Sequence, residues 1–174
     1  MNLYANELTN KEILDHKPFR WKSICMDMDL LKVKHKKINK INIVWKDVEF
    51  LKKNKTKVPS SQGIYMFVLD VSNGLNLYNT SKYILYVGQT INLKSRFNSY
   101  FGYANSDEPS DFLKRCMVLI WKRKLDFYFF ETKNLTAQEL TMVEFDIIDS
   151  VVPPINQRFR GRVLKKKIKL YSPR

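Results

Sequence analysis

Residues 63–100 read GIYMFVLDVSNGLNLYNTSKYILYVGQTINLKSRFNSY, and this stretch decides the fold. It begins inside a run rich in aliphatic and aromatic residues, Gln62 to Val71, which is typical of a β-strand. Lys82 to Val87 is a second run of this kind, and Asn73-Gly74 lies between the two. The pair therefore predicts a β-hairpin, whose connection, Ser72 to Ser81, is longer than a tight turn needs.

Two helices are predicted after the hairpin. The first is a basic amphipathic helix from Ile91 to Phe101, with Thr90 as its N-cap. The second follows a cap at Ser110, and its apolar residues cover most of its circumference, so it is expected to be buried.

The remaining elements complete an α+β fold. Leu125 to Thr132 predicts a third strand, and the capping-box spacing from Thr136 to Glu139 predicts a helix that runs to about Ser150. Pro153-Pro154 ends this helix. The order β-β-α-α-β-α predicts a small three-stranded antiparallel sheet flanked by helices.

The net charge of +14 is distributed unevenly along the chain. Residues 1–60 carry 14 Lys/Arg and 7 Asp/Glu, residues 61–157 carry 9 and 10, and residues 158–174 carry 8 and none. We therefore predict a basic N-terminal extension (1–60), a nearly neutral central domain (61–157) and a basic C-terminal tail (158–174), with a linker before residue 62. Basic flanks favour a polyanionic partner, most clearly for the tail. For residues 32–57, lysines that merely keep the protein soluble explain the charge equally well.

Several classes of protein are excluded by composition. The longest apolar runs have six residues, too few for a membrane span, and residues 1–20 hold no apolar block typical of a signal peptide. The widely separated Cys25 and Cys116 suit a reducing cytoplasm. With only His16 and His35 available, no familiar Cys/His zinc site can be written.

Glu144 lies in the middle of the apolar face of the last helix. At about 100° per residue, five apolar positions share its side of the helix. These are Ala137, Leu140, Ile147, Ile148 and Val151. A buried carboxylate requires a cation, an arginine partner or a raised pKa. The alternative is that Glu144 lies at the edge of the domain and bends outward to water.

Gly63-Ile64-Tyr65, then Tyr86-Val87-Gly88, then Arg96 ten residues after the second tyrosine resemble the GIY-YIG nuclease family. The resemblance covers roughly residues 62–157 and includes further positions downstream. It implies an α+β nuclease domain that hydrolyses phosphodiester bonds with a single divalent metal ion. Mg²⁺ is the expected ion, with Mn²⁺ as a substitute.

The resemblance also implies roles for individual residues. Tyr86 matches the base that activates water, and Tyr65 matches a tyrosine that orients or assists it. Arg96 matches the arginine that stabilises charge on the scissile phosphate, and Glu144 the glutamate that holds the metal. Asn156 matches an asparagine that organises the site through hydrogen bonds. The supporting positions are Gly63, Gly88 and Tyr100, the last as a tyrosine behind the site or in contact with phosphate.

One position departs from part of the family. Some members, including the bacterial excision-repair nucleases, have a lysine three residues after the second tyrosine, where this chain has Gln89. The contribution of that lysine is therefore absent here or supplied by another residue.

The sequence thus predicts a metal-dependent endonuclease acting on double-stranded DNA, most plainly of the restriction type because the short chain carries its own basic flanks. The alternatives are a repair, recombination or mobile-element nuclease that recognises DNA structure, and an inactive nucleic-acid-binding module. The oligomeric state stays open, with a homodimer as one option. Residues expected to contact DNA are Lys94, Arg158, Arg160, Arg162, Lys165, Lys166 and Lys167.

Overall fold

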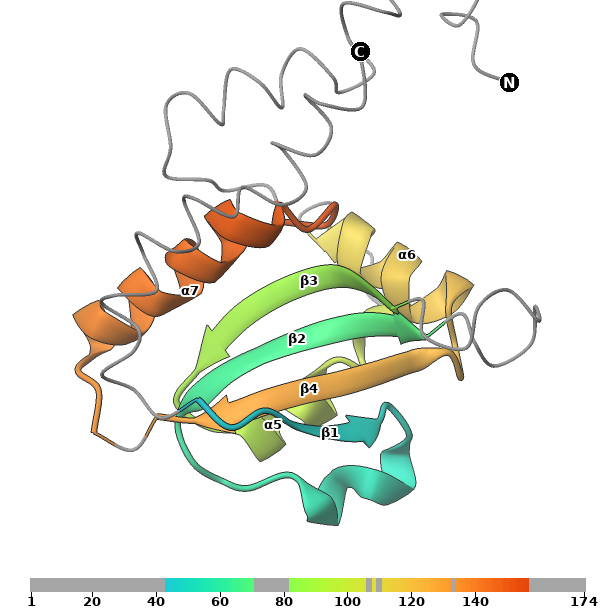
Figure 1. Cartoon of the computed structure of the whole chain (residues 1–174). Coiled ribbons are helices and arrows are strands. Elements are labelled where there is room, and N and C mark those ends of the chain that lie inside the picture. Colours follow the sequence, from blue (N-terminus) through green and yellow to red (C-terminus); the bar gives the residue numbers. More distant parts are fainter. Residues whose placement is uncertain (1–42, 71–81, 106–107, 109–110, 133, 157–174) are drawn as a thin grey trace, which may run out of the picture.

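The computed structural model describes residues 43–70, 82–105, 108, 111–132 and 134–156. Within these residues, antiparallel strands form one sheet in the order β1-β4-β2-β3 (Figure 1). The strands are β1 (Lys46–Glu49), β2 (Gly63–Asp70), β3 (Lys82–Thr90) and β4 (Leu125–Glu131). The prediction of a three-stranded sheet is wrong, because the described sheet has a fourth strand, β1, which pairs with β4 along its whole length.

Helices cover both faces of the sheet. One hydrophobic cluster joins the sheet to α5 (Leu93–Ser99) and α6 (Phe112–Ile120), and a second joins it to α7 (Ala137–Val151). The 3₁₀ turns η2 (Lys52–Lys57) and η3 (Tyr103–Asn105) complete the described elements. Apart from β1 and the 3₁₀ turns, the elements follow the predicted order.

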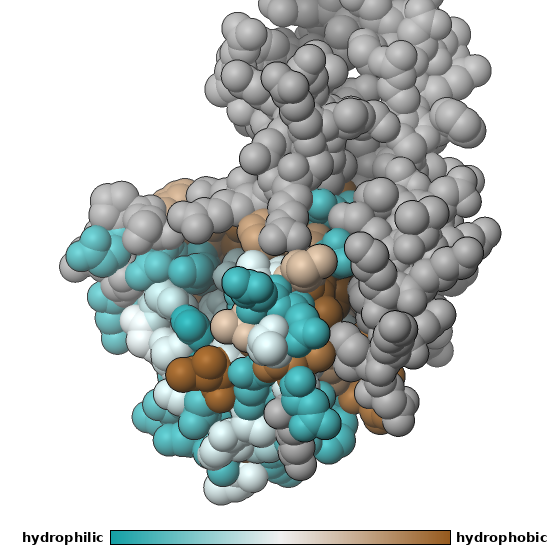
Figure 2. Space-filling model, turned by 90° about the vertical axis from the view of Figure 1, so that its left-hand side faces the viewer, coloured by the Kyte–Doolittle hydropathy of each residue, from teal (hydrophilic) through white to brown (hydrophobic). Residues whose placement is uncertain are grey.

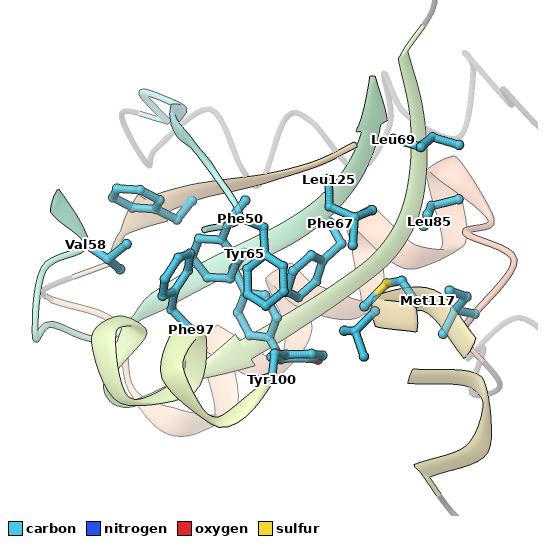
Figure 3. Packing of buried hydrophobic residues seen from close by; sticks show 14 of the residues in the cluster. Phe50, Val58, Tyr65, Phe67, Leu69, Leu85, Phe97, Tyr100, Met117 and Leu125 are labelled. Carbon is cyan, nitrogen blue, oxygen red and sulfur yellow. The ribbon is translucent and has the colours of Figure 1, made fainter. Parts of the chain in front are cut away.

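The central strand β2 is buried on both faces, which explains why its sequence is apolar without alternation. Tyr65 and Phe67 belong to the cluster on the α5 side, and Ile64 and Met66 belong to the cluster under α7. Figure 3 shows the aromatic rings gathered between the strands and α5. Phe67 packs edge-to-face with Phe50, with ring centroids 5.0 Å apart.

Residues before the boundary predicted near residue 61 already pack into the core of the central domain. Phe50 and Val58 are buried in the cluster under α5, and the Asn54 side chain donates a hydrogen bond to the carbonyl of Glu49 (3.0 Å). The lysines of η2 point outward, so this segment has the composition of a linker although it is folded onto the domain.

The start of α5 differs from the prediction. Thr90 is the last residue of β3, and Asn92 is the N-cap, accepting a hydrogen bond from the Ser95 N–H (2.8 Å). Thr90 Oγ1 instead accepts a hydrogen bond from the Asn92 N–H (3.1 Å). At α7 the predicted capping box between Thr136 and Glu139 is confirmed.

Helix α6 is buried on one side only, contrary to the prediction. Met117 and Val118 are buried, whereas Phe112 and Ile120 are 61% and 66% exposed. The N-cap is Asp111, and the predicted cap, Ser110, lies outside the described residues together with the hairpin connection, 71–81.

The surface seen in Figure 2 is largely hydrophilic over the described residues, with hydrophobic residues in separate patches. Among the described residues, no helix is both long and apolar enough to cross a membrane.

Candidate active site

Tyr65, Tyr86 and Tyr100 form a triangle of rings on the α5 side of the sheet. They come from β2, β3 and the C-cap of α5, and their ring centroids are 6.0 to 6.2 Å apart. Tyr65 Oη and Tyr100 Oη are 3.1 Å apart and share a hydrogen bond. Figure 3 shows Tyr100 at the end of α5, below Tyr65.

The three phenols differ in burial, and this difference limits the role that each can take. Tyr65 and Tyr100 are 2% and 0% exposed, whereas Tyr86 is half-buried and lines a pocket. Burial, and next the nearby phenol of Tyr86, raise the pKa of Tyr65 well above its usual range. Burial followed by the phenol of Tyr65 does the same for the pKa of Tyr100. Only Tyr86 of the three can therefore meet a ligand in that pocket.

Gly88 allows the two strand tyrosines to approach each other. A Cβ atom at this position would lie 2.5 Å from Tyr65 Oη and 2.9 Å from Tyr86 Cε1. At Gly63, a Cβ would run into the backbone carbonyl of Phe130 and lie 2.8 Å from Leu93 Cδ1. Both glycines of the motif are thus required by close contacts.

Arg96 lies half-buried on α5, beside the tyrosines. Burial lowers the pKa of this guanidinium, but the phenols of Tyr65 and Tyr100, followed by Tyr103 and Tyr86, raise it, and the net shift is upward. Its positive charge also lowers the pKa of Glu144. Arg96 is not among the residues that line the pocket, but its charge still acts on Glu144 there.

Glu144 projects from α7 into the same pocket as Tyr86. Burial raises the pKa of its carboxyl, while hydrogen bonds from the backbone and side chain of Gln89 and the charge of Arg96 oppose the shift. Gln89 also donates a hydrogen bond to Thr141 Oγ1 (2.9 Å), so its side chain ties β3 to α7. The carboxylate is half-buried and directed into the pocket, as the helical pattern predicted.

Asn156 reaches the pocket because the chain turns back after α7. Val152 takes a left-handed conformation (φ 47°) at the C-cap, and Ile155 N–H then donates to the carbonyl of Leu85 (3.0 Å). The Asn156 side chain accepts a hydrogen bond from Val87 N–H and donates one to its carbonyl, both 2.8 Å. Residues 155 and 156 thus cover the outer edge of β3.

The pocket at this edge has a volume of about 580 Å³. It lies between β3, α6, α7 and the segment after α7. Its lining residues are Tyr86, Gln89, Leu113, Lys114, Thr141, Glu144, Phe145, Ile148, Ile155 and Asn156. The structure therefore brings three of the predicted catalytic residues, Tyr86, Glu144 and Asn156, to one cavity.

Lys114 was not signalled by the sequence. It lies on the helix predicted to be buried, and no motif spacing connects it to β3 or α7. Thr141, a polar residue one turn before Glu144, was likewise not predicted to belong to the site. Both reach the pocket only because α6 and α7 pack around β3.

The donor set of the pocket fits one hard cation. Among the described residues, no group of three or more His, Cys, Asp or Glu side chains comes together, so Glu144 would be the sole carboxylate ligand. Mg²⁺ keeps several waters and is often held by one or two carboxylates plus substrate phosphates. A half-buried carboxylate with a raised pKa also gains when a cation neutralises it.

The residues predicted to contact DNA lie mostly outside the described part. Lys94 is on α5, half-buried, and does not line the pocket. Its backbone N–H donates to the carbonyl of Pro59 (2.9 Å). Six of the residues predicted to contact DNA lie outside the described ranges: Arg158, Arg160, Arg162, Lys165, Lys166 and Lys167.

No family model matches the chain. Over 140 residues it is 24% identical to the UvrABC system protein C of Wolbachia sp. subsp. Brugia malayi (strain TRS), in a match that covers 73% of this chain but 22% of that protein. The chain therefore spans about a fifth of the length of this curated relative.

Two solved structures of the GIY-YIG N-terminal endonuclease domain of UvrC from Thermotoga maritima are similar at low identity. One, a point mutant bound to its catalytic divalent cation, is 19% identical with a TM-score of 0.38, and the match covers 62% of this chain and 94% of that one. The other, bound to magnesium, is 19% identical with a TM-score of 0.37, and the match covers 60% and 93%. The chain is thus similar, at low identity, to proteins named for UvrC, and one of these is a GIY-YIG endonuclease domain.

Proposed function

We propose that this chain is a divalent-metal-dependent endonuclease that hydrolyses phosphodiester bonds in double-stranded DNA by GIY-YIG chemistry. One observation carries the proposal. Tyr86, Glu144 and Asn156 come from β3, α7 and the segment after it, yet all three line one pocket. A carboxylate that can hold a divalent ion and a phenol that can take up a proton, both at one cavity, suit metal-assisted phosphodiester hydrolysis.

Tyr86 is the base in this proposal. It is the phenol of the triangle that reaches the pocket, and in its deprotonated form it accepts the proton of the water that attacks phosphorus. Tyr65 and Tyr100 stay protonated because they are buried. Their shared hydrogen bond holds the two rings in place beside the ring of Tyr86. Arg96 places a positive charge beside these rings, which favours the deprotonated form of Tyr86 before the proton transfer and offsets the negative charge that develops on the phosphate during the attack.

Glu144 would hold the metal ion, with Mg²⁺ proposed as the natural ion and Mn²⁺ as a substitute. When bound, the ion would stabilise charge on the phosphate oxygens as a Lewis acid. Gln89 orients the carboxylate through its hydrogen bonds, and Asn156 keeps β3 and therefore Tyr86 in register with α7.

More than one biological role is compatible with this chemistry. A restriction-type nuclease in the cytoplasm, with a homodimer as one option, stays our prediction from the sequence, but the comparisons give it no support. A DNA-repair nuclease fits equally well, because the curated relative is a UvrABC system protein. The third alternative is an inactive binding module, which the three pocket residues argue against.

The test is cleavage of mixed-sequence duplex DNA by the purified full chain with Mg²⁺, followed by mapping of the ends. Cuts at discrete sequences support restriction, cuts at structural features support repair, and no cuts support the binding module. Glu144→Ala and Arg96→Ala should abolish cleavage while DNA binding largely persists. The control is Glu49→Ala, which removes an exposed carboxylate on β1, at the opposite edge of the sheet. Full activity in either site variant would reject the assignment.

A further inference from the structure

Lys114 brings a positive charge to the pocket that the motif does not provide. Its side chain lines the same cavity as Tyr86, Glu144 and Asn156. Of the described residues in that lining, Lys114 alone is a lysine or arginine. It belongs to α6, which packs against a different hydrophobic cluster of the sheet from α7, the helix that carries Glu144.

The ammonium group of Lys114 is held in place on two sides. Its Nζ donates to Asp111 Oδ1, one turn earlier on the chain (3.2 Å), and lies 4.9 Å from the centroid of the Tyr103 ring. The side chain is 26% exposed, so it is neither buried in the core nor extended into solvent. A lysine has three N–H donors. Among the described residues these contacts engage two sides of the group, so that a third donor can meet a ligand in the pocket.

The charges in the pocket favour such a group. A phosphodiester is an anion, and the carboxylate of Glu144 would repel it as long as no cation is bound there. Arg96 lies near the tyrosines but is not among the residues that line the cavity. Burial lowers the pKa of Lys114, but the hydrogen bond to Asp111 and the phenols of Tyr103 and Tyr86 more than offset this. The ammonium therefore stays charged at neutral pH.

We propose that Lys114 is a substrate-binding residue that contacts a DNA phosphate directly in this pocket. This rests on the proposed nuclease function. In the bound state, Lys114 holds the phosphate against Tyr86 from one side while Glu144 faces it from the other. A hydrogen bond between charged groups contributes about 1.5–3 kcal/mol, so its removal corresponds to roughly a tenfold to hundredfold effect.

The first measurement is DNA binding without cleavage. A chain carrying Glu144→Gln, kept in chelator, is combined with Lys114→Met, and the affinity for duplex DNA is measured over a range of salt concentrations. The slope of log K against log salt should become shallower by about 0.9, because Lys114 no longer neutralises a phosphate. Lys122→Met, which removes an exposed lysine just after α6, should leave the slope unchanged.

The second measurement is cleavage in the chain with Glu144 intact. Lys114→Met should lower cleavage roughly tenfold to hundredfold, and Lys114→Arg should keep most of it because the charge and a donor remain. A purely structural role would lower the melting temperature of Lys114→Met without changing the salt slope.

The outcomes separate the two proposals. If the unmodified chain neither cuts nor binds DNA, the nuclease function fails. If it does both, but Lys114→Met has the salt slope and activity of Lys122→Met, the nuclease stands and the role of Lys114 is overturned. That role is also overturned if Lys114→Arg loses as much activity as Lys114→Met.

Discussion

Asn156 and Val87 are joined by two hydrogen bonds of 2.8 Å, one in each direction. The carboxamide accepts from the backbone N–H of Val87 and donates to its carbonyl, as a neighbouring strand would. Val87 is fully buried, and it lies between Tyr86 and Gly88 on the edge strand β3. Asn156 therefore satisfies backbone groups that would otherwise be unpaired away from water.

Asn156→Ala should lower the free energy of unfolding by about 1–3 kcal/mol, because both Val87 groups lose their partner. Asn156→Asp should be no better, since a carboxylate cannot donate to the carbonyl. Chemical denaturation measures the change, and Asn98→Ala, at an exposed position of α5, is the control. Wild-type stability in Asn156→Asp would show that the donated bond does not matter.

Gly88→Ala should slow cleavage roughly a hundredfold with little loss of DNA binding. The new Cβ would lie 2.5 Å from Tyr65 Oη and 2.9 Å from Tyr86 Cε1, so the rings must shift, and a misplacement of about 1 Å can cost this much. Single-turnover cleavage measures the effect. Gly102→Ala is the matched control, because its Cβ would meet only the Ser99 carbonyl at 3.2 Å. Equal rates in the two variants would contradict the close packing of the tyrosines.

Tyr65 should make the fold sensitive to alkali. Burial raises its pKa in the folded state, whereas a tyrosine in the unfolded chain titrates near pH 10. Its contribution to stability is therefore complete below about pH 10 and falls as the pH rises above that value. Tyr65→Phe should make this decline shallower by about 1.4 kcal/mol per pH unit, measured by denaturation at several pH values. Tyr83→Phe, at an exposed tyrosine, is the control, and the same slope in the two variants would be the contrary result.

Local patterns were enough to predict much of the fold. The strands β2, β3 and β4 were found from their aliphatic and aromatic runs, and α7 from its capping box and its apolar face. The pairing of β1 with β4 could not be predicted. β1 has four residues, of which only Val48 is partly buried, so it carries no clear period. Its place in the sheet is decided by long-range pairing, which leaves no local mark.

The residues of the candidate site could likewise be predicted only in part. The inward direction of Glu144 followed from helical periodicity, and the tyrosines, Arg96 and Asn156 followed from the family resemblance. Lys114 could not be found, because its position depends on how α6 packs beside η3 and the edge of β3. Likewise, Asn92 rather than Thr90 caps α5 because β3 extends through Thr90, which only the strand pairing determines.

Removal of residues 158–174 should weaken DNA binding and flatten its dependence on salt. The deletion takes away eight Lys/Arg and no Asp/Glu. For each phosphate that these side chains neutralise, the slope of log K against log salt should fall by about 0.9. Filter binding or fluorescence anisotropy over a range of salt measures this, with the melting temperature as the check on folding. An unchanged slope would show that the tail does not touch phosphates.

Glu144 should link divalent-cation binding to stability. Burial raises the pKa of this carboxyl, so the folded state disfavours the ionised form. In chelator, the stability of the wild type relative to Glu144→Gln should therefore fall as the pH rises above about 4 and through the folded pKa. Glu144→Gln should accordingly be the more stable protein at neutral pH when no divalent cation is present.

Added Mg²⁺ should stabilise the wild type relative to Glu144→Gln. A cation that binds only the folded state stabilises it by about 1.4 kcal/mol at tenfold its Kd. The wild type should gain this amount and Glu144→Gln should gain almost nothing, because a carboxamide carries no charge for the ion. Thermal unfolding at several Mg²⁺ concentrations measures both, and Glu49→Gln, at an exposed carboxylate far from the pocket, should respond like the wild type. An equal gain in all three proteins would mean that the ion binds elsewhere and that Glu144 is not its ligand.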